Sequence, residues 1–247
     1  MATTIDLTGR VVLVTGGARG VGRGIVDVFR GADATVVACG RNAPEDATVD
    51  FIACDVREPE QVDAMVAEVV ARHGRLDVAV NNAGGSPAAD AATASPRFSE
   101  RVVALNLMAA LHVAQAANNV MQQQPDGGSI VSIGSVSGLR PSPGTAAYAA
   151  AKGGLLALTQ TLAAEWAPKV RVNVVTGGII ATEQSELFYG DAAQQAAIAK
   201  TVPMQRMGTP TDIGNACLFL ASPLASYVTG ANLVVHGGGE PPRYLDA

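Results

Sequence analysis

The sequence predicts a doubly wound α/β fold of the Rossmann type, in which a single parallel sheet carries helices on both faces. Short runs rich in β-branched residues alternate with longer helical patterns along most of the 247 residues. These runs are almost continuously apolar, which is typical of parallel strands buried on both sides. Neither a linker nor an internal repeat divides the chain, so we expect residues 1–247 to form one domain.

The first half of the chain contains four β-branched runs that predict strands. They are Arg10–Thr15, Ala34–Cys39, Val49–Cys54 and Asp77–Val80. A glycine-rich turn follows the first run and predicts a helix at about 20–31. A second helix is expected to begin at Pro59, because proline favours the first helical position, and to end near His73, because Gly74 suits a C-cap.

The second half continues the alternation. The expected elements are a helix from near Pro96 to about Gln123, a strand at Ser129–Ile133, a helix at about 145–166, a strand at Val170–Val175, a helix from Pro210 with Thr209 as its N-cap, and a strand at Ala231–Val235. Segment 183–202 interrupts the pattern, because it is polar, acidic and weakly periodic. We expect it to form a substrate lid.

Composition excludes several classes of protein. The net charge of −5 argues against nucleic-acid binding. No apolar run reaches the roughly 18 residues of a membrane span, and Met1–Asp6 does not resemble a signal peptide. The cysteines and histidines are widely spaced, so we expect no disulfide framework and no metal site. A cytoplasmic protein is expected.

A glycine-rich loop, Thr15-Gly-Gly-Ala-Arg-Gly-Val-Gly22, follows the first predicted strand and opens the first helix. Its spacing differs from the G-x-G-x-x-G fingerprint, but the physics is shared. Glycines let the backbone approach a diphosphate, and a helix N-terminus offers free N–H groups to it. A tight turn without a ligand is the alternative, and the position after the first strand favours the dinucleotide.

Two later motifs point to the same edge of the sheet, beyond the carboxyl ends of the strands, where ligands bind. Asp55 follows the third predicted strand, where its carboxylate can accept a hydrogen bond from an adenine amino group. Asn81-Asn-Ala-Gly84 follows the fourth, where small residues let a cofactor pass close to the chain. Either motif alone also fits an ordinary turn.

Tyr148 and Lys152 lie four residues apart, on one face of a predicted helix. A tyrosine with a pKa of about 10 is a poor base at neutral pH, but a neighbouring cation favours the phenolate. The pair can therefore serve as an acid/base, although an unrelated surface tyrosine and lysine would give the same pattern. Ser135, near the end of the fifth strand, can hold a carbonyl oxygen beside them.

Taken together, these motifs resemble the short-chain dehydrogenase/reductase family, in the branch marked by Thr-Gly-x-x-x-Gly-x-Gly and Tyr-x-x-x-Lys. The similarity spans about residues 6–239 and includes the closing stretches Arg206–Pro210, Phe219–Ser222, Tyr227–Gly230 and His236–Gly238. It implies NAD(P)-dependent oxidation of a secondary alcohol or reduction of a ketone.

The resemblance also implies residue roles. Tyr148 would exchange a proton with the substrate oxygen, Ser135 would orient that oxygen, and Lys152 would lower the pKa of Tyr148 and hold the nicotinamide ribose. Asn106 would support a water-linked proton relay to Lys152. The implied cofactor contacts are Gly16, Arg19, Gly20, Val21, Gly22, Arg41, Asp55, Val56, Asn82, Ala83, Gly84, Tyr148, Lys152, Gly178, Ile180 and Thr182.

One departure from the family pattern follows the sixth strand. The family usually reads Asn-x-Val-x-Pro-Gly-x-Ile-x-Thr, whereas Gly177 stands here in place of the proline. Glycine has more backbone freedom than proline. We therefore expect a looser segment where Ile180 and Thr182 would hold the nicotinamide carboxamide.

The second strand indicates which dinucleotide is used. Relatives that prefer NAD usually carry an acid at its end, where it binds the ribose hydroxyls. Gly40 occupies that position here, and Arg41 follows it, while Arg19 lies in the glycine loop. Two guanidinium groups suit a 2′-phosphate, so NADP(H) is the expected cofactor and NAD(H) the alternative.

Three functions stay open. The first is a dehydrogenase or reductase of a small hydroxy or keto compound. The second is a 3-oxoacyl-carrier-protein reductase, which the acidic lid residues Glu183, Glu186 and Asp191 disfavour because an acidic carrier needs a basic surface. The third is a non-catalytic dinucleotide-binding regulator. The substrate, its stereochemistry and the tail 240–247 are unassigned.

The resemblance further implies a homotetramer. The helices at about 96–123 and 145–166 are rich in alanine and glycine, and they would pair across a twofold axis. The last strand would supply a second interface. Packing of the small residues onto the sheet alone is the alternative.

Overall fold

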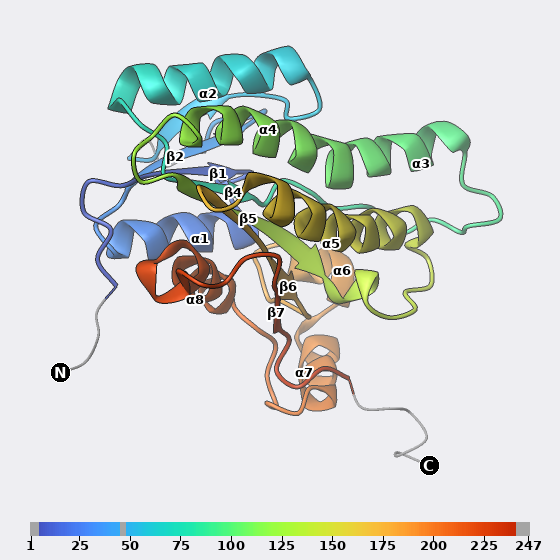
Figure 1. Ribbon diagram of the computed structural model, residues 1–247. Coiled ribbons are helices and arrows are strands. Elements are labelled where there is room, and N and C mark those ends of the chain that lie inside the picture. The colour runs from blue at the N-terminus through green and yellow to red at the C-terminus, as the bar shows by residue number, and fades with distance from the viewer. Residues whose placement is uncertain (1–4, 45–47, 241–247) are drawn as a thin grey trace.

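The computed structural model describes residues 5–44 and 48–240, and its centre is a seven-stranded parallel sheet in the order β3-β2-β1-β4-β5-β6-β7 (Figure 1). The strands are β1 (Val11–Thr15), β2 (Thr35–Gly40), β3 (Asp50–Ala53), β4 (Val78–Asn81), β5 (Gly128–Ser135), β6 (Val170–Gly177) and β7 (Asn232–Val235). The order of the strands reverses between β1 and β4: β1 to β3 follow one another toward one edge of the sheet, and β4 to β7 follow one another toward the other edge. The crevice beyond β1 and β4 is therefore the expected ligand site of the fold.

Helices cover both faces of this sheet, as Figure 1 shows. One face carries α1 (Gly20–Gly31) and α8 (Pro210–Ala221), and the other carries α2 (Pro59–His73), α4 (Ala109–Met121) and α5 (Ala146–Trp166). Alternate residues of β1 divide between the two cores: Val12 and Val14 face α1 and α8, whereas Val11 and Leu13 face the other layer. The predicted doubly wound fold is confirmed.

The helix-ending signals in the sequence also work as expected. Gly74 has a left-handed φ of 77°, and its N–H donates to Val70 O at 2.7 Å, which closes α2. Thr209 caps α8 in a reciprocal capping box with Asp212. The predicted bounds of α1 and α2 are confirmed.

The long helix expected from Pro96 to about Gln123 contains an irregular turn. It consists of α3 (Pro96–Val103), a π-helical turn η1 (Ala104–Met108) and α4. The side-chain amide of Asn106 donates to Val102 O at 2.9 Å. In a regular α-helix that carbonyl would accept the backbone N–H of residue 106. A side chain inserted into the hydrogen-bond ladder thus accompanies the π turn.

The segment 183–202 contains two helices that the sequence did not predict, α6 (Ser185–Tyr189) and α7 (Ala192–Thr201). The side chain of Asp191 starts α7 by accepting the N–H of Gln194. No residue of α7 is buried, so its sequence has no apolar stripe from which to recognise a helix.

Residues 1–4 of the N-terminal start and 241–247 of the tail lie outside the described part of the chain. Within the described ranges, every helix is too short or too polar to cross a membrane. The same residues contain no cluster of three or more histidine, cysteine or acidic side chains that could hold a metal ion.

Candidate functional site

Hydrogen bonds join the carboxyl ends of β1 and β4 into one floor. The buried Thr15 hydroxyl accepts the backbone N–H groups of Asn82 and Ala83, both at 3.0 Å. In return, Asn82 Nδ2 donates to Thr15 O at 2.9 Å. The two motifs that the sequence placed after separate strands are therefore in direct contact.

The glycine loop lies on this floor and leaves the N-terminus of α1 open. Gly16 and Gly20 have left-handed φ values of 66° and 55°. A Cβ at Gly22 would lie 2.1 Å from Gly16 O, so the turn is too close for any side chain there. A Cβ at Gly20 would instead meet nothing nearer than 3.8 Å, and its nearest neighbour is the carboxylate of Glu183.

The carboxylate of Glu183 shows that the glycine loop can bind an anion. Glu183 Oε1 accepts the N–H of Gly20 at 2.9 Å, across 163 positions of the sequence. The N-terminus of a helix favours negative charge because its first N–H groups are free and its dipole is positive there. The residues present therefore fit the diphosphate of a dinucleotide. Sequence reasoning counted Glu183 among the lid acids and gave it no contact with the loop.

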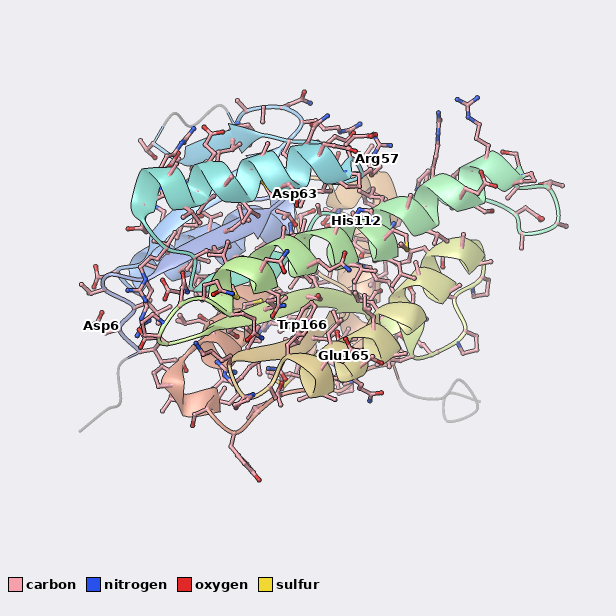
Figure 2. The ribbon with its side chains drawn as sticks, turned by 45° about the horizontal axis from the view of Figure 1, so that its top comes forward. Asp6, Arg57, Asp63, His112, Glu165 and Trp166 are labelled. Atoms are coloured by element: carbon pink, nitrogen blue, oxygen red, sulfur yellow. The ribbon has the colours of Figure 1, made fainter. Side chains whose placement is uncertain are left out.

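Asp55, the expected adenine acceptor, forms an ion pair in the structure. Arg57 Nε donates to Asp55 Oδ1 at 2.9 Å, and Arg57 Nη2 contacts Oδ2. Hydrogen bonding by Arg57, with a smaller contribution from Arg41, holds the pKa of Asp55 below its ordinary value. Figure 2 shows Arg57 beside the start of α2. A carboxylate has about four acceptor positions, so Asp55 can still take another donor.

Arg57 was missed by the sequence analysis, although its place two residues after an acid at a strand end is a usable signal. The two arginines that were singled out, Arg19 and Arg41, are both exposed. Their guanidinium groups are thus available to a ligand at this end of the sheet.

Asn106 forms a clamp on the motif after β4. Its side chain accepts the N–H of Gly85 at 2.8 Å and donates to Gly85 O at 2.9 Å. A Cβ on Gly84 would lie 2.7 Å from Asn106 Oδ1 and 3.5 Å from Lys152 Nζ. Gly84, Asn106 and Lys152 therefore meet at one point, and the contact leaves no room for a larger residue at 84.

Lys152 is buried beneath Tyr148. Its side chain is 5% exposed, its ammonium donates to Ile133 O at 2.8 Å, and Nζ lies 5.6 Å from the centroid of the Tyr148 ring. Burial lowers the pKa of Lys152 to about 8, because a charged group loses hydration there. The ammonium therefore lies within cation–π distance of the phenol ring.

Tyr148 and Ser135 are brought together as expected, but the pKa of the phenol moves the other way. Burial raises the pKa of Tyr148, and a hydrogen bond with Ser135 opposes that rise. The lowering expected from Lys152 is not found: desolvation of the phenolate dominates, and the opposing contribution comes from Ser135. The phenol is thus protonated at neutral pH in this structure.

A second phenol lies on α6, in the segment 183–202. Burial raises the pKa of Tyr189 on α6, and the charge of Tyr148 raises it further. Its neighbours Leu187 and Phe188 are exposed, at 79% and 63%. Tyr189 is therefore the residue of this short helix whose pKa responds to the charge of Tyr148, and no sequence pattern distinguished it.

The segment after β6 is hydrogen-bonded to the chain at Gly208. Gly177 pairs in register with Ser135 and Val235 at the end of the strand. Beyond it, Ala181 N donates to Gly208 O at 2.8 Å, and Gly208 N donates to Ile179 O at 2.9 Å. The sequence analysis did not foresee this bridge to Gly208, and the loosening expected from Gly177 stays a prediction.

A small hollow lies against Tyr148, between the chain after β4 and the start of α5. Most of its walls are alanine, glycine or serine, and Phe98 is the large exception. Its lining residues are Ser86, Ala89, Ala91, Ala94, Phe98, Ser99, Gly144, Thr145, Ala146, Ala147 and Tyr148. A hollow of this composition suits a small organic substrate.

Comparison with known proteins identifies relatives across the chain. A family model described as enoyl-(acyl carrier protein) reductase matches residues 16–240. An uncharacterised oxidoreductase of Mycobacterium tuberculosis is 33% identical, over 94% of this chain and 92% of that protein. The 3-oxoacyl-(acyl-carrier-protein) reductase FabG of Thermotoga maritima is 35% identical, over 94% of this chain and 98% of that protein.

Two further similarities bear on fold and length. An uncharacterised short-chain type dehydrogenase/reductase of Sinorhizobium fredii is 38% identical over 93% of this chain, which spans 43% of that longer protein. The ligand-free structure of an aldohexose dehydrogenase from Thermoplasma acidophilum superposes with a TM-score of 0.90 at 33% identity, covering 96% of both chains.

Proposed function

Because the chain belongs to the short-chain dehydrogenase/reductase family of oxidoreductases, which bind a nicotinamide dinucleotide, we propose that it transfers hydride between NADP(H) and a ketone or secondary alcohol. One observation carries the proposal: the buried ammonium of Lys152 lies 5.6 Å from the ring of Tyr148, and Ser135 is close enough to this phenol to lower its pKa. A structural tyrosine and lysine would not need a serine at the end of β5 as a third partner.

The bound nicotinamide supplies or accepts the hydride. Tyr148 handles the proton, and its raised pKa keeps the phenol protonated and able to act as the acid when a ketone is reduced. Ser135 holds the substrate oxygen beside the phenol. Lys152, charged below a pKa of about 8, stabilises the phenolate that forms after the proton has left.

The donors that the structure presents support the cofactor contacts proposed from the sequence. The N-terminus of α1 offers N–H groups to the diphosphate, and Asn82, Ala83 and Gly84 form the floor beside it. Asn106 fixes that floor through Gly85 and would connect Lys152 to water. Ile180 and Thr182, whose segment is bridged to Gly208, would border the nicotinamide.

The preference for NADP(H) rests on charge at the ends of β2 and α1. Arg19 and Arg41 are exposed, and Gly40 leaves no acid to repel a 2′-phosphate. Arg41 also lies close enough to Asp55 to lower its pKa, so it extends toward the nucleotide end of the sheet. A planar guanidinium can bind a phosphate through two donors.

We further propose that 183–202 is a lid and that the enzyme is a homotetramer acting on a small molecule. The lid residues Leu187 and Phe188 expose apolar surface, which a bound substrate would cover. In the segment that precedes the edge strand β7, Tyr227 is fully exposed and Leu224 is 55% exposed. A second subunit at this edge would remove both from water.

A 3-oxoacyl-carrier-protein reductase is the second candidate, favoured by similarity to FabG proteins over almost the whole chain. The acidic lid residues Glu183, Glu186 and Asp191 oppose docking of an acidic carrier. The third possibility, a regulator without catalysis, is set aside because the relatives are dehydrogenases and reductases.

The experiment that tests the proposal is a screen of ketones and secondary alcohols, followed by absorbance at 340 nm with NADPH and with NADH. We expect turnover that is faster with NADPH at subsaturating cofactor. Acetoacetyl thioester is included with and without carrier protein, and a large gain with the carrier would favour the second candidate. Equal or better efficiency with NADH would refute the cofactor assignment.

A further inference from the structure

The contact between Glu183 and Gly20 joins the lid to the glycine loop. Glu183 lies between Thr182 and the start of α6, and its carboxylate accepts the first N–H of α1 at 2.9 Å. Thr182 approaches the same point, since its Cγ2 would be 3.9 Å from a Cβ on Gly20. The lid thus begins directly over the open side of the loop.

This carboxylate supplies α1 with an anion that the helix itself lacks. Arg19, the N-cap residue, makes no side-chain capping bond, and the first turn of α1 contains no acid. Asp or Glu near a helix N-terminus is stabilising because it meets the positive end of the dipole. Glu183, although remote in the sequence, therefore supplies the acceptor and the negative charge that a capping residue supplies in other helices.

A dinucleotide diphosphate needs the same N–H groups and the same positive end. Two anions cannot accept from Gly20 N together, and like charges at that distance repel. We propose that Glu183 competes with the cofactor diphosphate for the N-terminus of α1, so that diphosphate binding releases the start of the lid from the glycine loop. This inference rests on the proposed function, because it requires a dinucleotide at this loop.

The start of the lid is built to move as a unit. Thr182 N donates to Ser185 Oγ at 2.8 Å, and Gln184 N donates to Thr182 Oγ1 at 3.3 Å. Release of Glu183 therefore displaces a closed turn, and α6 follows it directly with Tyr189 at its end. Cofactor binding would in this way shift the position of Tyr189, whose pKa responds to the charge of Tyr148.

Binding of cofactor fragments tests the competition without any turnover. ADP carries the diphosphate and adenosine does not, so the two are titrated into the full chain by calorimetry. Glu183→Gln keeps an acceptor for Gly20 N but removes the charge. We expect it to bind ADP and NADPH about 2- to 5-fold more tightly than the wild type, the range for one exposed charge at a helix N-terminus. Adenosine binding should not change.

Glu186→Gln is the matched control, because Glu186 is an exposed acid only three positions away, on the lid helix α6 that follows Glu183. It alters the net charge by the same amount, so an equal gain in ADP affinity in this variant would show a general charge effect and overturn the proposal. An unchanged dissociation constant for ADP in Glu183→Gln would overturn it as well.

Hydrogen–deuterium exchange measures the coupling to the lid. ADP should speed exchange of the amides in 182–190 in the wild type, and Glu183→Ala should exchange fast there already, with no further effect of ADP. Slower or unchanged exchange with ADP in the wild type would refute the release of the lid. If the wild type binds neither ADP nor NADPH, the proposed function falls too, whereas normal binding with no difference between variants removes this inference alone.

Discussion

Replacing Lys152 by methionine should change how stability depends on pH. Burial lowers the pKa of Lys152 from 10.5 to about 8. One pKa unit corresponds to about 1.4 kcal/mol, so below pH 8, where both states hold the proton, the charge costs the folded protein about 3 kcal/mol. As the pH rises toward 10.5, the folded state loses the proton first and the cost disappears.

The variant removes this cost and also removes the donor to Ile133 O, which costs roughly 1–3 kcal/mol at every pH. The free energies of unfolding of the variant and the wild type therefore differ little at pH 7, but this difference changes strongly with pH. Relative to the wild type, Lys152→Met should lose about 2 kcal/mol between pH 7 and pH 9.5. Tyr148, the titratable group that faces Lys152, keeps its proton in this window because its own pKa is raised.

Urea unfolding at matched protein concentration, followed by tryptophan fluorescence at pH 7, 8.5 and 9.5, measures the difference. Methionine is unbranched and fits the space of the lysine stem, so packing changes little. A stability difference that stays constant over this range would show that Lys152 is not a desolvated cation and would refute the reasoning.

Four other predictions concern catalysis, cofactor preference, packing at Gly84 and assembly. Tyr148→Phe should lower kcat by about 10²- to 10⁴-fold with NADPH binding nearly intact, and retention of half the turnover with chemistry rate-limiting would contradict its role. Arg41→Ala should raise KM for NADPH by about 10-fold or more and leave KM for NADH nearly unchanged, as steady-state kinetics can show. Gly84→Ala should destabilise the protein by about 1–3 kcal/mol, because its Cβ would lie 2.7 Å from Oδ1 of Asn106, whose side chain two hydrogen bonds to Gly85 hold in place. Gly31→Ala is the control, since no atom lies within 4 Å of its Cβ. Equal melting temperatures of the two variants would refute the prediction. Light scattering should give a tetramer mass at micromolar concentration, and a monomer mass would exclude the proposed assembly.

The fold and most of the elements were predictable because their signals are local. Pro59 and Gly74 mark the ends of α2, and the apolar runs mark strands buried on both sides. The two helices of segment 183–202 were not predictable, since α7 buries none of its residues and therefore lacks the apolar stripe that identifies a helix. The π turn around Asn106 was hidden for a different reason, because a side chain bonding to its own helix leaves no trace in hydrophobic periodicity.

The candidate site shows the same division. The tyrosine, lysine, serine and glycine motifs could be placed at one sheet edge from their order after successive strands. The contacts of Arg57 with Asp55 and of Glu183 with Gly20 depend on how loops meet in space, and the second pair is separated by 163 positions. The pKa of Tyr148 could not be deduced either, because the balance between a nearby cation and burial requires coordinates.

The π turn at 104–108 is one residue longer than a regular α turn, and Asn106 lies within it. Removing one residue there would restore regular α-helix and leave α3 and α4 in nearly the same relative orientation, because the turn itself takes up the extra residue. Val102 O would then accept a backbone N–H, and the side-chain amide of Asn106 would lose the bond that now holds it beside Gly85. The segment before Pro96 is a loop, which can gain or lose residues at a low cost in stability. Length changes among homologous chains should therefore collect in that loop and avoid the five residues around Asn106.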